Sequence, residues 1–224
     1  MSLHSARTSL HGLYVILDPS MITRRSLVDG LKEVAAAGAR LFQYRDKHAS
    51  GREAYRIATE LRDAAADAGA LFVVNDRCDL ALAVGADGVH LGQQDLPVRL
   101  ARAIMGADKL IGLSTHTAAQ VTEATAQGAD YIGFGPIFAT GTKANHEPVV
   151  GIDGLRQVRA LTTLPIFAIG GVTVETAESL IDTGADGLAV ISAIWKDGDP
   201  DRAVRQFMGR LVQPNPRALE PPDR

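Results

Sequence analysis

The stretch Gly128-Ala129-Asp130-Tyr131-Ile132 decides the fold, because close echoes of it begin at Gly38, Gly85 and Gly184. Each echo follows an amphipathic, alanine-rich segment and precedes a short apolar run. A glycine directly after a helix readily adopts the left-handed conformation that ends the helix. The apolar run that follows is too short for a helix and is typical of a buried parallel strand. Each echo therefore predicts that a helix ends, the chain turns and a strand begins.

Further apolar runs bring the number of expected strands to eight. These are Leu13–Leu17, Arg40–Tyr44, Leu71–Val74, Gly88–Leu91, Leu110–Leu113, Tyr131–Phe134, Ile166–Ile169 and Gly187–Ile191. Helical patterns alternate with them near residues 25–37, 52–68, 77–84, 97–106, 117–127, 152–161, 173–183 and 200–211, with Pro97, Asp153 and Thr173 as helix-start residues. This alternation predicts an α/β fold, a single (β/α)8 TIM barrel with parallel strands. An open doubly wound sheet is the alternative, but it rarely uses eight such regular units.

Composition narrows the class of protein. The chain has 224 residues, a formal net charge of -3 and one cysteine, Cys78. It has too little positive charge for a nucleic-acid binder that works by bulk charge, and one cysteine excludes a disulfide framework. The polar N-terminus and the lack of a long apolar run predict no signal peptide and no membrane partner, hence a cytoplasmic location. We expect an N-terminal extension at residues 1–12, a catalytic barrel at 13–212 and a disordered, Pro-rich tail at 213–224.

Polar residues follow the expected strands at the end where the active sites of such barrels lie. Gln43, Arg45 and Lys47 alternate after the second strand, so the two cations would share one face and could grip a diphosphate. Asp76 and Asp95 follow the third and fourth strands and form a hard oxygen site suited to one Mg²⁺ ion. The alternatives are a solvated charged loop for the cations and simple helix caps for the two acids.

A second anion site is expected after the last two strands. Gly170, Gly171, Ile191 and Ser192 lie where barrels often bind phosphate through backbone N–H groups. The alternative is a plain tight turn. The longest connection, from about 135 to 151, contains Thr140, Thr142 and Lys143, and such loops are commonly lids, although a mobile polar loop is equally compatible with these residues. His90, His116 and His146 are weaker candidates, since no metal-ligand spacing connects them.

Together these motifs resemble the thiamine phosphate synthase family over about residues 13–208. The matching stretches are Gln43-Tyr-Arg45-Asp-Lys47, Asn75-Asp76-Arg77, His90-Leu-Gly-Gln93-Gln-Asp95, Gly112-Leu-Ser114-Thr-His116, Gly135-Pro136-Ile-Phe-Ala-Thr140-Gly-Thr142-Lys143, Ala168-Ile-Gly170-Gly171 and Val190-Ile191-Ser192. The chain departs from the pattern at Gly141 and at 144–147, which bears on the geometry of the loop more than on the reaction.

The resemblance implies a Mg²⁺-dependent transferase that joins hydroxymethylpyrimidine diphosphate to a thiazole phosphate and releases pyrophosphate. By the family's pattern, the pyrimidine diphosphate would be held by Gln43, Arg45, Lys47, Asn75, Ser114 and Lys143. The metal would be held by Asp76 and Asp95, and the thiazole phosphate by Thr140, Thr142, Gly171, Ile191 and Ser192. His90, His116 and Gly170 would have supporting roles. Small-molecule substrates are the expected partners, and a homo-oligomer is among the expected states.

Three rival functions stay open at this point. A thiazole tautomerase-like isomerase would share the barrel and the phosphate end and could use His116 for proton transfer. Another phosphate-binding barrel enzyme, of sugar-phosphate metabolism, would explain Gly170, Gly171 and Ser192 but would leave Asp76 and Asp95 without a joint role. A non-catalytic sensor of a phosphate ligand would have no use for the metal site.

Overall fold

The computed structural model describes residues 9–141 and 147–211. Eight parallel strands pair in sequence order and close into one barrel, which confirms the predicted fold and excludes the open sheet. The strands are β1 (Gly12–Leu17), β2 (Leu41–Tyr44), β3 (Leu71–Asn75), β4 (Gly88–Leu91), β5 (Leu110–Thr115), β6 (Tyr131–Phe134), β7 (Ile166–Ile169) and β8 (Gly187–Val190). Their ends differ from the expected ones by no more than two residues.

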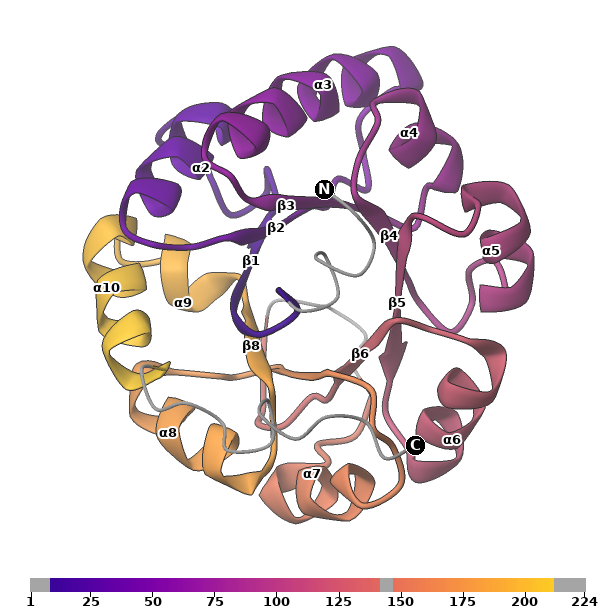
Figure 1. Ribbon diagram of the computed structural model, residues 1–224. Helices are drawn as coiled ribbons and strands as arrows, with labels where there is room; N and C mark the ends of the chain where they lie inside the picture. The colour runs from indigo at the N-terminus through magenta and orange to yellow at the C-terminus, as the bar shows by residue number, and fades with distance from the viewer. Residues whose placement is uncertain (1–8, 142–146, 212–224) are drawn as a thin grey trace.

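The helices form a ring outside the strands (Figure 1). They are α2 (Leu27–Ala36), α3 (Gly51–Asp67), α4 (Cys78–Ala83), α5 (Val98–Met105), α6 (Ala118–Gln127), α7 (Gly151–Arg159), α8 (Val174–Thr183), α9 (Ser192–Trp195) and α10 (Pro200–Leu211). Sequence patterning missed the four-residue α9, which is too short to show periodicity. Asp153 does not start a helix as expected, because α7 begins at Gly151.

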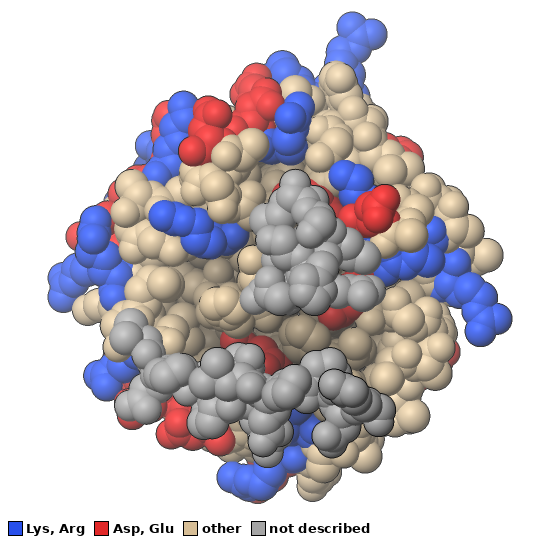
Figure 2. Space-filling view, viewed as in Figure 1, with Lys and Arg blue, Asp and Glu red and all other residues tan. Residues whose placement is uncertain are grey.

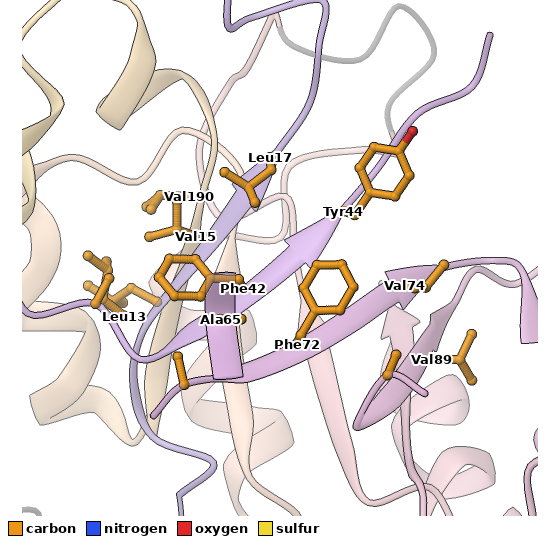
Figure 3. Packing of buried hydrophobic residues seen from close by; sticks show 14 of the residues in the cluster. Leu13, Val15, Leu17, Phe42, Tyr44, Ala65, Phe72, Val74, Val89 and Val190 are labelled. Carbon is orange, nitrogen blue, oxygen red and sulfur yellow. The ribbon is translucent and has the colours of Figure 1, made fainter. Parts of the chain in front are cut away.

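Side chains on the strands alternate between two cores, because successive residues of a strand point to opposite faces. The outward set packs under the helices and includes Leu13, Val15, Phe42, Phe72 and Val89 (Figure 3). The inward set fills the barrel and comprises Leu10, Tyr14, Ile16, Leu41, Leu71, Val73, Leu110, Tyr131, Phe167 and Ala189. Toward the C-terminal ends of the strands, the inward positions are polar. They are occupied by Gln43, Asn75, His90 and Ser114, whose side chains therefore lie inside the barrel mouth.

Leu10 belongs to this inner core although it precedes the first strand. Its side chain is only 3% exposed and packs among the barrel-filling residues. The remainder of the expected N-terminal extension at 1–8 and the expected tail at 213–224 lie outside the described residues.

The aspartates of the repeated Gly-Ala-Asp turns link neighbouring strands at the N-terminal end of the barrel. Asp87, Asp130 and Asp186 each accept a hydrogen bond of 2.8 Å from a backbone N–H of the preceding strand. Each also donates its own backbone N–H to the carbonyl oxygen of that same strand residue, at 2.8–2.9 Å. The repeat is therefore a structural device that pairs the starts of adjacent strands.

The charged surface carries both signs. On the face shown in Figure 2, Lys and Arg atoms are interspersed with Asp and Glu atoms around the ring of helices. Such a mixed surface does not give the single-signed field that steers polyanions. Over the described ranges, 9–141 and 147–211, none of the helices combines the length and hydropathy needed to cross a membrane.

Candidate active site

A cavity of about 480 Å³ opens at the C-terminal ends of the strands. A smaller cavity of about 40 Å³ adjoins it toward the barrel interior and shares several lining residues with it. The main cavity is lined by predicted site residues from six of the eight strand ends and from the 135–151 connection: Arg45, Lys47, Asn75, Asp76, Asp95, Ser114, His116, Thr140, Gly170, Gly171, Ile191 and Ser192. Gln43 and His90 line the smaller cavity instead. Every predicted site residue that the structure describes thus borders one of the two cavities.

Three predicted residues fall between the two described ranges. Thr142, Lys143 and His146 lie outside the described residues, within 142–146. The part of the same connection that precedes them is held firmly. The N–H of Ile137 donates to the carbonyl oxygen of Ile169 at 2.9 Å, and that of Phe138 donates to Gly170 at 3.0 Å. The start of this connection is therefore a fixed wall of the cavity.

Both cations after β2 contact carboxylates. The Arg45 guanidinium pairs with Asp18, whose side chain is 7% exposed, and the Lys47 ammonium pairs with Asp76. Ser20 donates its hydroxyl to the second oxygen of Asp18 at 2.6 Å. Asp18 is thus held on both sides and fixes the direction of the Arg45 side chain.

Asp18 was missed by sequence reasoning, although a signal was present. It follows β1 directly, so the rule that singled out polar residues after the later strands also applies to it.

Asp76 is held in an uncommon backbone conformation. Its φ of 62° lies in the left-handed region, where residues other than glycine are rare. Its backbone N–H donates to the carbonyl oxygen of His90 at 2.8 Å, which ties the turn after β3 to β4. Such outliers concentrate at functional sites, where the surrounding structure holds them in place.

The two acids are neighbours and neither caps a helix. Helix α4 has Arg77 as its N-cap and α5 has Pro97, in both cases without a side-chain capping bond, so the capping alternative is wrong. Asp95 instead accepts the backbone N–H of Gly92 at 2.6 Å. Burial raises the pKa of the Asp76 carboxyl, and the nearby Asp95 carboxylate raises it further, while Lys47 opposes the rise.

This arrangement fits a divalent cation. A positive charge between Asp76 and Asp95 would relieve the unfavourable interaction that raises the pKa of Asp76. Among the residues that the structure describes, no group of three or more His, Cys, Asp or Glu side chains could hold a metal. Mg²⁺ does not need such a group, since it is usually bound by one or two carboxylates together with substrate phosphates and water.

The glycines after β7 are required by the backbone. Gly170 and Gly171 have φ values of 92° and 64°. A Cβ on Gly170 would lie 2.5 Å from Pro136 Cβ, and one on Gly171 would lie 2.7 Å from the carbonyl oxygen of Ala139. The tight-turn alternative therefore describes these residues correctly, but the turn also borders the cavity, as does Ser192, the first residue of α9 after the neighbouring strand β8.

His116 lines the cavity, and one of its ring nitrogens contacts the backbone. Its Nδ1 lies 2.5 Å from the carbonyl oxygen of Gly135, which can only accept, so Nδ1 carries the proton. This contact fixes the orientation of the imidazole ring beside the cavity.

Comparison with known proteins agrees with the fold and with the family that the motifs resemble. The family model described as thiamine monophosphate synthase matches residues 13–194. A thiamine-phosphate synthase from Chloroflexus aurantiacus is 44% identical over 207 residues, which are 92% of this chain and 95% of that protein. One from Methanoculleus marisnigri is 45% identical over 202 residues, or 90% and 96% of the two chains.

The solved structure of thiamine phosphate pyrophosphorylase from Pyrococcus furiosus superposes with a TM-score of 0.82 at 35% sequence identity, and the match covers 95% of this chain and 99% of that one. A 3-hexulose-6-phosphate synthase structure also superposes, with a TM-score of 0.64, at 17% identity over 90% of this chain and all of that one. The latter likeness shows the barrel alone.

Proposed function

This chain belongs to the thiamine monophosphate synthase family, and on that premise we propose how its barrel mouth carries out the family's reaction. The activity is that of a thiamine-phosphate synthase, a transferase of thiamine biosynthesis. The two substrates would be hydroxymethylpyrimidine diphosphate and a thiazole phosphate. Pyrophosphate would leave the pyrimidine methylene carbon, and the thiazole nitrogen would take its place.

The pyrimidine diphosphate would bind at the β2, β3 and β5 ends. Arg45 supplies a planar fork and Lys47 a point charge for the diphosphate, while Asn75 provides an uncharged donor beside them. Gln43 and Ser114 border the inner cavity, where the ring of the pyrimidine would lie. Lys143 would hold the departing pyrophosphate.

Asp76 and Asp95 would hold one Mg²⁺ ion, with diphosphate oxygens completing its ligand set. Bound there, the ion would neutralise charge that develops on the departing pyrophosphate. Lys47 contacts Asp76, so the ammonium and the metal ligand would act on the same end of the diphosphate. The proximity of the two carboxylates and the raised pKa of Asp76 support this assignment.

The thiazole phosphate would bind on the opposite side of the cavity. Gly171, Ile191 and Ser192 offer backbone N–H groups and one hydroxyl there, and Thr140 offers a second hydroxyl from the 135–151 connection. Thr142 would add a third, and Gly170 and His116 would shape this end. The two anion-binding regions are thus supplied by different strand ends, as a reaction of two phosphorylated substrates requires.

The chemistry needs stabilisation of charge more than a nucleophile. An electron-rich aminopyrimidine stabilises a positive methylene carbon, so departure of pyrophosphate can precede attack by the thiazole. The protein would contribute cations around the leaving group and a cavity that keeps water from the cation. The residues around the cavity suit this demand, since they supply cations and hydrogen-bond donors on opposite sides of it.

The observation that carries this proposal is the convergence of two cation–carboxylate pairs, Arg45–Asp18 and Lys47–Asp76, on one side of a cavity whose other side is lined by the glycine turn. Purified protein should form thiamine phosphate and pyrophosphate from the two substrates in the presence of Mg²⁺. Correctly folded protein that forms no product from these substrates would refute the assignment.

A further inference from the structure

A chain of five polar side chains crosses the inside of the barrel and joins two residues of the active site. The Gln43 amide Nε2 donates to the Tyr14 hydroxyl at 2.8 Å, and the hydroxyls of Tyr14 and Tyr131 lie 2.9 Å apart. His90 continues the chain, with Nδ1 3.2 Å from the Tyr131 hydroxyl and Nε2 3.0 Å from Ser114 Oγ. Gln43 and Ser114, at its two ends, both line the inner cavity.

The barrel leaves space for this chain. A Cβ on Gly112 would overlap the Tyr131 ring and would lie 2.5 Å from His90 Nδ1, so only glycine fits at this inward position of β5. The Phe167 ring packs edge-on against both tyrosines, with centroid distances of 5.2 and 5.6 Å. These contacts hold the two phenols in place, so their hydroxyl groups have little freedom to choose other partners.

The hydrogen atoms along the chain run in one direction. Burial raises the pKa of the Tyr14 and Tyr131 phenols well above the ordinary value, so both keep their protons. Because Tyr14 receives a hydrogen from Gln43, it donates its own to Tyr131, and Tyr131 donates to His90 Nδ1. His90 then carries its proton on Nε2 and donates it to Ser114, whose own hydrogen remains for a ligand.

The two ends of this hydrogen-bonded chain of side chains therefore have opposite hydrogen-bonding roles toward a ligand. Gln43 uses its amide nitrogen for Tyr14 and borders the inner cavity, where its carbonyl oxygen is an acceptor available to a ligand. Ser114 offers a donor. Reversing every hydrogen bond would exchange these roles together, so Gln43 and Ser114 cannot change independently.

We propose that Tyr14, Tyr131 and His90 are positioning residues whose hydrogen-bond direction makes the site select an aminopyrimidine over the corresponding oxopyrimidine. This inference rests on the proposed function, in which Gln43 and Ser114 hold the pyrimidine. An aminopyrimidine offers an amino donor and a ring-nitrogen acceptor, which complement the two ends of the chain. The oxo counterpart offers a carbonyl acceptor and a ring N–H donor. Its carbonyl would face the Gln43 carbonyl oxygen and its N–H would face the Ser114 hydroxyl hydrogen, so neither hydrogen bond could form.

The test compares the two pyrimidine diphosphates as substrates at saturating thiazole phosphate. The wild-type protein should use the amino compound at least about a hundredfold better, measured as kcat/KM, because a site built around buried hydrogen bonds rejects a mismatched partner strongly. Tyr131→Phe keeps the ring and removes the hydroxyl that links Tyr14 to His90. It should reduce the preference about tenfold, mainly by lowering kcat/KM for the amino compound. Tyr14→Phe should have the same effect from the other end.

Thr115→Val is the matched control. Thr115 is fully buried on β5 beside Ser114, but its hydroxyl lies on the outer face, where it donates to the carbonyl oxygen of Gly133 at 3.1 Å. This variant loses one buried hydrogen bond and should keep the wild-type preference. If the folded tyrosine variants also keep it, the three residues serve stability alone and the proposal is wrong.

A second measurement does not depend on turnover. Nitrogen chemical shifts of ¹⁵N-labelled histidines, with the His90 signals assigned by their loss in His90→Gln, should show His90 protonated on Nε2 in the wild-type protein. Tyr131→Phe should abolish that fixed tautomer. A His90 protonated on Nδ1 would overturn the proposed direction. Wild-type protein inactive with both pyrimidines would instead refute the proposed function.

Discussion

Aspartate occurs at both ends of the barrel, in surroundings that differ. At the N-terminal end, Asp87, Asp130 and Asp186 each accept a backbone N–H of the neighbouring strand, and Arg102 and Arg159 pair with the last two. At the C-terminal end, Asp76 has a φ of 62° and a pKa raised by burial and by Asp95. Backbone N–H groups hold the carboxylates of the first group, whereas the Lys47 ammonium does not fully offset the burial of Asp76 and its interaction with Asp95. We propose that a bound cation completes the second group, so substitutions at the two ends should separate stability from activity.

The largest expected effect is on stability, at the N-terminal end. Asp130 has a fully buried side chain that accepts from Ile111 N at 2.8 Å and from Arg102 Nη2 at 2.5 Å. Asp130→Ala should lower the free energy of unfolding by about 3 kcal/mol in urea titrations, because it leaves both donors without that acceptor. The kcat of the molecules that remain folded should not change.

The matched control is Asp63→Ala, which removes an exposed pair with Arg62. It should change the free energy of unfolding by less than about 0.5 kcal/mol. A loss of kcat in folded Asp130→Ala protein would break the comparison, since it would connect this end to catalysis.

Asp76→Asn should have the opposite result, a loss of activity without a loss of stability. We expect a fall in kcat of roughly a hundredfold or more, because the substitution removes a charge that we propose holds the metal. In chelator, the variant should unfold at a higher temperature than the wild type, since asparagine tolerates positive φ and carries no charge. The wild type and the variant should be equally stable below the ordinary carboxyl pKa. As the pH rises from that value through the raised pKa of Asp76, the wild type should lose stability relative to the variant.

Asp79→Asn is the control for the predicted direction of the change in stability, because the pKa of Asp79 is shifted downward and not upward. Arg77 lowers the pKa of the exposed Asp79 carboxyl, so this substitution should slightly destabilise the protein at neutral pH and leave activity intact.

Near-normal turnover in Asp76→Asn would contradict the metal assignment.

Asp18→Asn tests a third kind of aspartate. Asp18 lies at the C-terminal end of the barrel, but we expect it to act on the substrate only by orienting Arg45. The substitution should raise the KM for the pyrimidine diphosphate about tenfold, since the Arg45 guanidinium loses its charged partner. The KM for the thiazole phosphate should not change. Ser20→Ala, which removes one hydrogen bond to Asp18, should shift the same KM less. Equal changes in both KM values would show that Asp18 supports the whole cavity.

The smallest expected effect is at the thiazole phosphate end. Ser192→Ala should raise the KM for the thiazole phosphate about fivefold, as for the loss of one hydrogen bond to a charged group, and should change the KM for the pyrimidine diphosphate less. Ser179→Ala, on the exposed face of α8, should change neither. A larger change for the pyrimidine diphosphate would mean that the two anion sites have been exchanged.

The sequence by itself determined the barrel and most of the cavity lining. Short apolar runs that alternate with amphipathic segments are local patterns, so they show in the chain without its fold. The rule that polar residues after parallel strands meet at one end was enough to bring Arg45, Asp76, Asp95 and Ser192 together. The four-residue α9 was missed because its length gives no periodic pattern.

Only the tertiary structure decided which partners these residues have. The sequence could not show that Asp130 binds a strand backbone while Asp76 lies beside Asp95, because residue type does not reveal which groups meet in the folded barrel. Nor could it show the chain from Gln43 through Tyr14, Tyr131 and His90 to Ser114, whose members are far apart in sequence and meet only when the barrel closes. Partner choice depends on distance and direction in three dimensions, which a one-dimensional pattern does not contain.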